Sequence, residues 1–405
     1  MHMKLHYLLP NLLLLSTHTA SAQIPSAYAE RLQFVLDSVC EVHNIKGASA
    51  AVAVPDVGVW EGVYGLSHAG VPITPNMFLG IGSNTKTFVA ATILKLQEQG
   101  LLDLQDTIGT WIQHPNIAGS ITIRQLLRHT SGLYNFTNSG PWSNAVWSDM
   151  SQLWDTEEVL QFVAAPTAVP GTTWSYSNTN YLVAGLIIEE VTGQPLGDVI
   201  HSTVLDPAGL DSTVYYNAAT QDLAIPHIWS SAFTPAPYLE DLNTTYAYNH
   251  NSLMTAVGGA GAMLATAKDN ALFWSKLMTG GILTNSQWTD MTTVVTINAN
   301  LAYGLGVNRR SNFNGTTVWS HGGANVGFIN ENIADPNTGI GISVLTNQDS
   351  IGNSIILNQL VRVLHAVDIE AFTGIAEAAD VSFSIHPNPA TDLMYIDLGA
   401  ATSIS

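Results

Sequence analysis

Strand-like sequences near both ends of the chain, with helical sequences between them, constrain the fold most strongly. The runs 48–55 (ASAAVAVP) and 58–65 (GVWEGVYG) come early, and the runs 316–328 and 339–347 come late. The last of these, GIGISVLTN, is apolar and β-branched, as in a strand that is buried on both faces. We therefore expect an α+β fold in which N- and C-terminal segments form an antiparallel sheet flanked by helices, with a mainly helical middle region.

Helix signals punctuate the region between these strands. Thr122 and Gln125 form a capping box, and Gly100 and Gly193 stand where helices usually end in a left-handed residue. An earlier amphipathic pattern has an apolar face made of Leu32, Val35, Leu36, Val39 and Cys40. Cys40, the one cysteine, cannot form an internal disulfide, and we predict a buried structural thiol rather than a nucleophile.

The first 22 residues have the three parts of a secretory signal peptide. Lys4 supplies a positive charge, Leu8 to Leu15 form a short apolar run, and Ala20-Ser21-Ala22 is a small-residue cleavage site. The run is too short to span a bilayer as a helix, and no later stretch is long and apolar enough to do so. We predict cleavage before Gln23, no membrane span, and export to the periplasm, the cell surface or the extracellular medium.

The charge balance argues against two classes of partner. The 405 residues include 12 basic and 31 acidic side chains, for a formal net charge of −19 at pH 7. A surface of this sign repels nucleic acid and anionic lipid headgroups, so neither is expected as a partner. With 46% hydrophobic residues, the chain can bury one large core or two smaller ones.

A serine and a lysine share the first turn of the helix predicted to end at Gly100. Ser83 and Lys86 form the only Ser-x-x-Lys sequence among six lysines. A serine there can cap free amides, whereas a lysine is disfavoured by the positive end of the helix dipole. A desolvated lysine beside a hydroxyl has a lowered pKa and can accept a proton. The pair therefore predicts nucleophilic catalysis, with the Ser83 amide facing a developing oxyanion.

Two further groups are weaker when taken alone. The sequence Tyr-Ser-Asn at 176–178 lies in a polar loop before a helix, but the same Tyr-x-Asn spacing recurs at 215–217. His321 lies in a strand-like run and is followed by Gly322 and Gly323, which would let a ligand approach the backbone. A half-buried tyrosine and a hydrogen-bonded structural histidine are the alternatives for these two groups.

Taken in order, the three groups resemble the serine β-lactamase and penicillin-binding protein superfamily. The similarity is to the branch that holds class C β-lactamases, D-alanyl-D-alanine carboxypeptidases and related esterases, whose second element is Tyr-x-Asn. The stretch ITIRQLLRHTSGL at 121–133 is also similar to this branch, and the resemblance covers roughly residues 26–367. It implies a β-lactamase/transpeptidase-like serine hydrolase domain at 23–368 that needs no metal or other cofactor.

The resemblance implies a role for each matching residue. Ser83 would be the acylated nucleophile, and Lys86 and Tyr176 would exchange protons with it and with the leaving group. Which of the two is the base in each step stays open, because coupled groups share their titration. The residues that bind substrate or stabilise the oxyanion would be Asn178, His321, Gly323 and Ala324. The backbone amides of Ser83 and Ala324 would form the oxyanion hole.

The implied substrates are small peptides, esters or β-lactams. The first hypothesis is a D-alanyl-D-alanine carboxypeptidase-like peptidase, and the alternatives are an esterase or a class C-type β-lactamase.

Where β-lactamases have Lys-Thr-Gly, this chain has His321-Gly322-Gly323. A permanent cation and a hydroxyl that help to hold a substrate carboxylate are therefore missing. An unperturbed histidine titrates near ~6.5, so we expect carboxylate substrates to bind more weakly as the pH rises through that range.

Other classes of function fit these residues less well. An α/β-hydrolase needs Gly-x-Ser-x-Gly, and the nearest sequence, at 65–69, ends in alanine. The thirteen histidines are scattered and form no His-Glu-x-x-His, which gives no support to a zinc hydrolase. A non-catalytic secreted binding protein of the same fold is the remaining alternative, but such a protein is expected to have lost Ser83, Lys86 or Tyr176.

The C-terminal residues differ in character from the rest. Residues 369–380 read as a linker, and residues 381–405 contain two alternating runs around the turn His-Pro-Asn-Pro at 386–389. An ordinary hairpin would have this pattern. The segment also resembles the start of the C-terminal sorting domain of the type IX secretion system of Bacteroidetes. This implies a truncated sorting domain and the secretion machinery as a partner.

Overall fold

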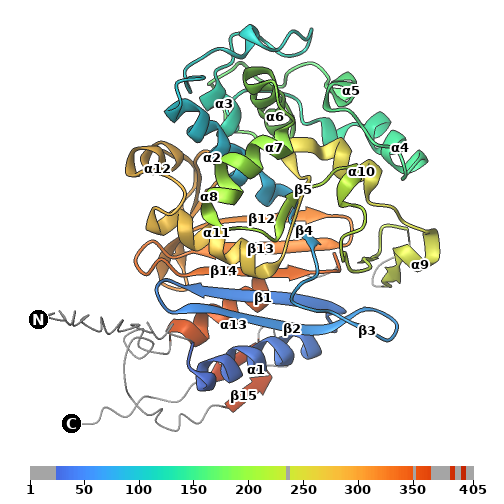
Figure 1. The fold of residues 1–405 in the computed structure, drawn as a ribbon, viewed down its shortest axis with the longest axis vertical. Coiled ribbons are helices and arrows are strands. Elements are labelled where there is room, and N and C mark those ends of the chain that lie inside the picture. Colours follow the sequence, from blue (N-terminus) through green and yellow to red (C-terminus); the bar gives the residue numbers. More distant parts are fainter. Residues whose placement is uncertain (1–23, 234–237, 350–352, 366–383, 388–393, 398–405) are drawn as a thin grey trace, which may run out of the picture.

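In the computed structural model, a nine-stranded antiparallel sheet forms the centre of the fold (Figure 1). The structure describes residues 24–233, 238–349, 353–365, 384–387 and 394–397. In order across the sheet, the strands are β3 (Val71–Pro72), β2 (Gly58–His68), β1 (Gly47–Val54), β14 (Gly341–Thr346), β13 (Phe328–Ala334), β12 (Thr316–Asn325), β11 (Asn308–Phe313), β10 (Leu301–Tyr303) and β9 (Val295–Asn298).

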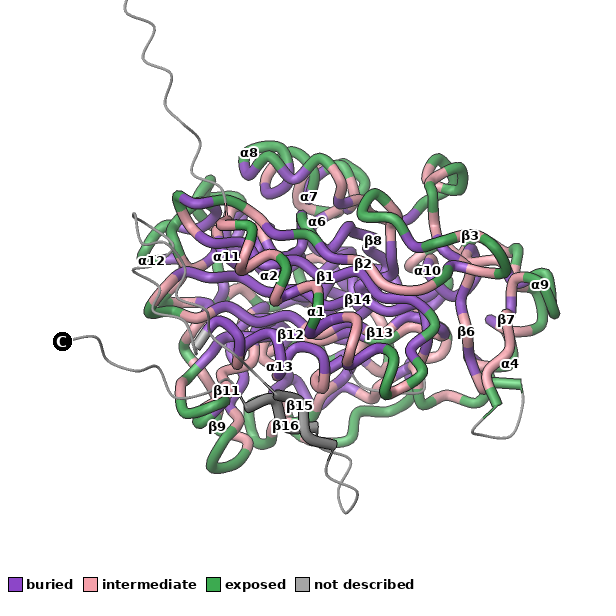
Figure 2. Tube along the Cα trace, turned by 90° about the horizontal axis from the view of Figure 1, so that it is seen from below, coloured by how far each residue is buried: buried purple, intermediate pink, exposed green. Residues whose placement is uncertain are grey.

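The two ends of the domain meet in the middle of this sheet. β1 pairs with β14 in an antiparallel register that places Ala48 opposite Thr346 and Ala53 opposite Gly341. Every residue of both strands is buried, and the central strands are coloured as buried in Figure 2. Burial on both faces explains why their sequences are apolar without a strict alternation. The predicted α+β fold, with a sheet built from both chain ends, is confirmed.

Helices cover both faces of the sheet and create the two larger of three hydrophobic cores among the described residues. α1 (Ser26–Val42) and α13 (Ser354–His365) lie on one face, and α11 (Ala267–Thr279) lies on the other (Figure 1). The first core includes Cys40, which has no exposed surface, and burial raises the pKa of its thiol. The prediction of a structural thiol is therefore confirmed. The second core fills the space between α11 and the helical middle region.

The middle region is mainly helical, as predicted. Its helices and those that follow it are α2 (Thr85–Glu98), α3 (Ile123–Leu127), α4 (Gly140–Ser148), α5 (Thr156–Val159), α6 (Thr179–Thr192), α7 (Leu196–Ile200), α8 (Asp206–Ala208), α9 (Leu242–Tyr246), α10 (Asn251–Val257) and α12 (Asn285–Met291). Two small sheets accompany them, one of β4 (Leu79–Gly80), β8 (Met263–Ala265) and β5 (Thr213–Tyr215), and one of β6 (Trp229–Ser230) and β7 (Glu240–Asp241).

The local helix signals act as predicted. Thr122 caps α3 and Gln125 returns the hydrogen bond, which completes the capping box. Gly193 follows α6 with φ of 66°, and Gly100 follows α2 with φ of 72°. Within the described part of the chain, no helix is both long and apolar enough to cross a membrane.

The C-terminal segment is described in two short pieces. β15 (Ser384–Pro387) and β16 (Met394–Asp397) pair in an antiparallel ladder, so the two strands predicted around the turn are present. The turn residues 388–393, the linker at 369–380 and the predicted signal peptide at 1–22 lie outside the described residues.

Candidate active site

Ser83 lies in a 3-10 turn, Gly82–Asn84, that leads directly into α2. Gly82 has φ of 46°, and a Cβ on it would lie 2.7 Å from the backbone nitrogen of Ala324. A Cβ on Gly323 would lie 2.7 Å from the backbone nitrogen of Ser83. Gly323 therefore makes room for the turn that carries Ser83, rather than for a ligand as the sequence suggested. The backbone amides of Ser83 and Ala324, which are predicted to form an oxyanion hole, belong to the two segments that approach each other here.

Lys86 is buried beneath Ser83 in the first turn of α2. Its Nζ lies 2.9 Å from Ser83 Oγ and donates a hydrogen bond of 2.7 Å to the carbonyl oxygen of Ala260. The side chain has no exposed surface, and this burial holds the pKa of Lys86 well below its usual value. An amine with a lowered pKa in contact with a hydroxyl can take up the proton of that hydroxyl.

Tyr176 and Asn178 reach the same place from the loop before α6. Lys86 Nζ lies 5.0 Å from the centroid of the Tyr176 ring. Burial raises the pKa of Tyr176, and its hydrogen bond with Ser83 opposes that rise. Asn178 Nδ2 donates to Thr137 Oγ1 at 3.0 Å. The structure thus brings Tyr176 and Asn178 to the Ser83 turn, although more than ninety positions of sequence separate them from Ser83.

A cavity of about 600 Å³ opens in front of Ser83. Of the residues predicted for the site, Ser83, Asn178 and Ala324 line it, whereas Lys86 lies behind Ser83. Its apolar wall includes Trp142, Trp147, Leu253 and Val257, and its polar lining includes Thr137, Ser231, Asn325 and Asp349. The combination of a hydroxyl, a buried amine and a partly apolar cavity suits attack on the carbonyl of a small acyl donor.

His321 occupies a different place from the one predicted. The residue is only 4% exposed and is not among those that line the cavity. Its Nδ1 lies 2.6 Å from the carbonyl oxygen of Gly322, to which it donates, so its Nε2 accepts from the hydroxyl of Tyr303 at 3.0 Å. Burial, followed by the nearby Lys86, lowers the pKa of His321 to about 3. The expectation that His321 titrates near neutrality is therefore wrong. The burial that lowers its pKa could not be predicted from the sequence.

A chain of buried asparagines, not identified from the sequence, ties the Ser83 turn to the sheet. Asn330 Nδ2 donates to the carbonyl oxygen of Ile81 at 2.7 Å, and Asn332 Nδ2 donates to Asn330 Oδ1 at 2.7 Å. Asn270 Nδ2 then donates to Asn332 Oδ1 at 2.8 Å, and Asn84 Nδ2 donates to Asn270 Oδ1 at 2.7 Å. Asn330 and Asn332 alternate along β13, so one face of a buried strand carries two amides. This spacing of two asparagines is the sequence feature that could have indicated a buried hydrogen-bond network.

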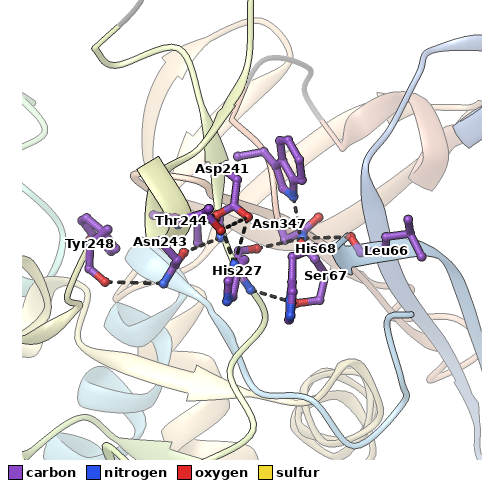
Figure 3. Close-up of polar contacts among 11 residues, drawn as sticks. Leu66, Ser67, His68, His227, Asp241, Asn243, Thr244, Tyr248 and Asn347 are labelled. Carbon is purple, nitrogen blue, oxygen red and sulfur yellow. Dashed lines mark hydrogen bonds and ion pairs between the residues drawn. The ribbon is translucent and has the colours of Figure 1, made fainter. Parts of the chain in front are cut away.

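A second polar cluster surrounds His227, shortly before Ser231 and Ala232, which line the cavity (Figure 3). His227 Nδ1 lies 3.0 Å from Asp241 Oδ2, and the His227 ring stacks on His68 with centroids 3.8 Å apart. Ser67 Oγ accepts from the His227 backbone at 2.9 Å and contacts His68 Nδ1 at 3.0 Å. Ser67 is 1% exposed, and its hydroxyl contacts the ring of His68, whereas Asp241 pairs with the ring of His227. The three groups therefore do not form a serine–histidine–aspartate relay, and the cluster is structural. Among the described residues, no group of three or more His, Cys, Asp or Glu side chains could hold a metal ion.

Comparisons with known proteins place this geometry in a family. Residues 35–365 match the family model described as Beta-lactamase. The chain is 28% identical over 204 residues to penicillin-binding protein 4* of Bacillus subtilis (strain 168), which covers 49% of this chain and 44% of that protein. It is 31% identical over 233 residues to esterase EstB of Burkholderia gladioli, which covers 52% of this chain and 59% of that protein.

The chain spans about half the length of the curated relatives it matches. Among solved structures, it is similar to a D-stereospecific amidohydrolase from Streptomyces sp., with a TM-score of 0.69 and 27% identity over 84% of this chain and 97% of that chain. The family model extends over most of the sequence, including every residue of the Ser83 site. The chain therefore belongs to the Beta-lactamase family of serine hydrolases.

Proposed function

We propose that this protein hydrolyses small acyl donors through an acyl-enzyme on Ser83. The observation that carries the proposal is the 2.9 Å contact between Ser83 Oγ and the fully buried Nζ of Lys86, at the wall of a cavity. In the first step, Oγ attacks the substrate carbonyl while Lys86 takes its proton. The amides of Ser83 and Ala324 stabilise the oxyanion, and Asn178 binds the substrate.

The opposite pKa shifts of Lys86 and Tyr176 suggest how the two divide the proton transfers. Burial lowers the pKa of Lys86, which suits a base, and raises the pKa of Tyr176, which keeps its hydroxyl protonated. We assign Lys86 as the base of acylation and Tyr176 as the group that hands a proton to the leaving atom. Water then attacks the acyl-enzyme, and the transfers run in reverse to release the acid and restore Ser83.

Of the activities considered, an esterase-type activity on acyl donors without a carboxylate fits the cavity best. A D-alanyl-D-alanine peptide and a β-lactam both present a carboxylate, which a cation usually holds. The described residues that line the cavity include no lysine or arginine, and His321 is buried and neutral. A class C-type β-lactamase or a carboxypeptidase would therefore find no cation in this lining to hold the substrate carboxylate. We keep these two activities as the alternatives.

A two-substrate comparison tests this assignment. We expect a neutral p-nitrophenyl ester to be turned over with a kcat/KM at least about tenfold above that of a D-Ala-D-Ala peptide, since a buried, unpaired carboxylate is costly. Because the pKa of His321 is lowered to about 3, the ratio of the two KM values should stay constant from pH 5.5 to 8.5. A preference for the peptide, or a peptide KM that rises through about pH 6.5, would favour the carboxypeptidase alternative.

We also propose that the hydrolase domain at 23–368 is an exported domain. The signal-peptide pattern at 1–22 and the type IX-like segment at 381–405 support this proposal from the sequence. Expression in a Bacteroidetes host, followed by N-terminal sequencing of the protein outside the cytoplasm, should return a chain that begins at Gln23. Recovery of the uncleaved chain from the cytoplasm alone would contradict the proposal.

A further inference from the structure

Asp349 is the one charged residue among the described residues that line the cavity with Ser83. It follows β14 and is partly buried. Its Oδ2 accepts a hydrogen bond of 2.6 Å from Ser230 Oγ and one of 3.1 Å from the backbone N–H of Gly327. Both hydrogen bonds use the same oxygen, and a carboxylate can accept further donors on the other. The cavity therefore carries a negative charge with remaining capacity for a donor.

The backbone around this carboxylate is held in place from two sides. Asn347 accepts from the N–H of Trp229 at 2.8 Å through its backbone oxygen, and its side chain donates to the carbonyl oxygen of His227 at 2.8 Å (Figure 3). Ser230 Oγ also accepts from the N–H of Ala232 at 3.0 Å. A carboxylate on such a support needs little reorganisation to bind a ligand, which reduces the entropic cost of recognition.

No opposite charge in the described structure neutralises Asp349. The ion pairs found among the described residues do not include it. The lining contains no lysine or arginine within those residues, whereas it does contain Trp142 and Trp147. Tryptophan faces attract cations as well as apolar groups, so the aromatic wall and the carboxylate favour the same kind of ligand. A substrate carboxylate would instead meet a like charge.

We propose that Asp349 selects acyl donors that carry a protonated amine. The ammonium group binds the Asp349 carboxylate while the scissile carbonyl lies at Ser83, and the apolar part of the acyl group packs against Trp142 and Trp147. The substrate class is therefore amine-bearing esters or amides with an apolar substituent. This inference rests on the proposed acyl-enzyme function at Ser83 and adds a specificity determinant to it.

Asp349→Asn is the informative variant because it removes the charge and keeps an acceptor oxygen for Ser230 and Gly327. The substrates are three p-nitrophenyl esters of matched acyl size, one with an ammonium group, one neutral and one with a carboxylate. We expect the wild type to prefer them in that order. In Asp349→Asn, kcat/KM for the ammonium ester should fall roughly tenfold, mainly through KM, and the neutral ester should change less than about twofold.

Asp103→Asn is the control, since Asp103 is an exposed loop residue outside the cavity. It removes the same charge and should leave all three esters unchanged. An unchanged preference in a folded Asp349→Asn variant overturns the inference and leaves Asp349 as a loop anchor. Failure of the wild type to hydrolyse any of the three esters refutes the proposed function instead, so the two failures are distinguishable.

A measurement on the wild type keeps the inference testable if Asp349→Asn does not fold. Benzylamine and benzyl alcohol have similar shapes, and only benzylamine is a cation at neutral pH. We expect benzylamine to inhibit neutral-ester hydrolysis competitively at roughly tenfold lower concentration, and this advantage to shrink in high salt. Equal inhibition by the two compounds overturns the inference.

Discussion

Replacing Ser83 with alanine is expected to abolish acylation and to lower kcat/KM by about 10⁴-fold or more, as removal of a nucleophile does in other serine hydrolases. Lys86 and Tyr176 would remain in place with no hydroxyl to activate. The fold should persist, because Ser83 is only partly buried and its side chain makes two hydrogen bonds, one accepted from Lys86 and one with Tyr176, each worth about 1 kcal/mol. Intact mass spectrometry after incubation with an ester or a penicillin measures the adduct directly.

Ser231→Ala is the matched control for that variant, since Ser231 lines the same cavity. It should retain the adduct and keep kcat/KM within about threefold of the wild type. Digestion of the acylated wild type should place the added mass on the peptide that contains Ser83. An adduct on Ser67 or Ser131, each of which is 1% exposed, would show that the nucleophile is misassigned.

Replacing Lys86 with methionine should remove most activity and also change how stability depends on pH. We expect kcat/KM to fall by roughly 10³-fold, because the base of acylation is lost while the volume of the side chain is kept. Lys86→Arg should be similarly inactive, since a guanidinium stays protonated at any usable pH. Activity close to that of the wild type in either variant would remove Lys86 from the base role.

The sign of the pH effect follows from burial. The pKa of Lys86 is lowered in the folded state, so between that value and about 10.4 the unfolded chain holds one more proton on this group than the folded protein does. The wild type should therefore gain stability relative to Lys86→Met as the pH rises from 7 to 9, by at most about 1.4 kcal/mol per pH unit. Urea unfolding of both proteins at several pH values measures the difference.

Lys95→Met is the control for the linkage measurement. Lys95 lies on the same helix, but its side chain is partly exposed and pairs with Glu98. That variant should keep the wild-type activity and the wild-type dependence of stability on pH. A parallel course for the wild type and Lys86→Met between pH 7 and 9 would mean that Lys86 keeps its proton on folding, which would contradict its role as a neutral base.

Local patterns made much of the fold predictable. The apolar runs that became β1 and β14, the capping box at Thr122 and the glycine after α6 each depend on residues a few positions apart. The Ser83 and Lys86 pair was visible for the same reason, since residues three apart on a helix share a face. The family motifs added Tyr176 and Asn178, which no local rule would have joined to Ser83.

Tertiary structure decided the features that depend on distant segments. The pKa of His321 is lowered by burial and by Lys86, which lies more than two hundred positions earlier in the chain. The asparagine chain joins Asn84 to Asn270 across 186 positions, and no sequence period links them. Asp349 lines the cavity with Ser83 only because the sheet pairs the end of β14 with β13, whose Ile329 lines the same cavity. The sequence alone therefore determined the secondary structure, the sheet made from both chain ends and the pairing of Ser83 with Lys86, because each follows from short-range spacing or an ordered motif. The charge state of His321, the role of Gly323 and the charge of the cavity at Ser83 were decided by packing, since desolvation and proximity exist only once remote segments meet.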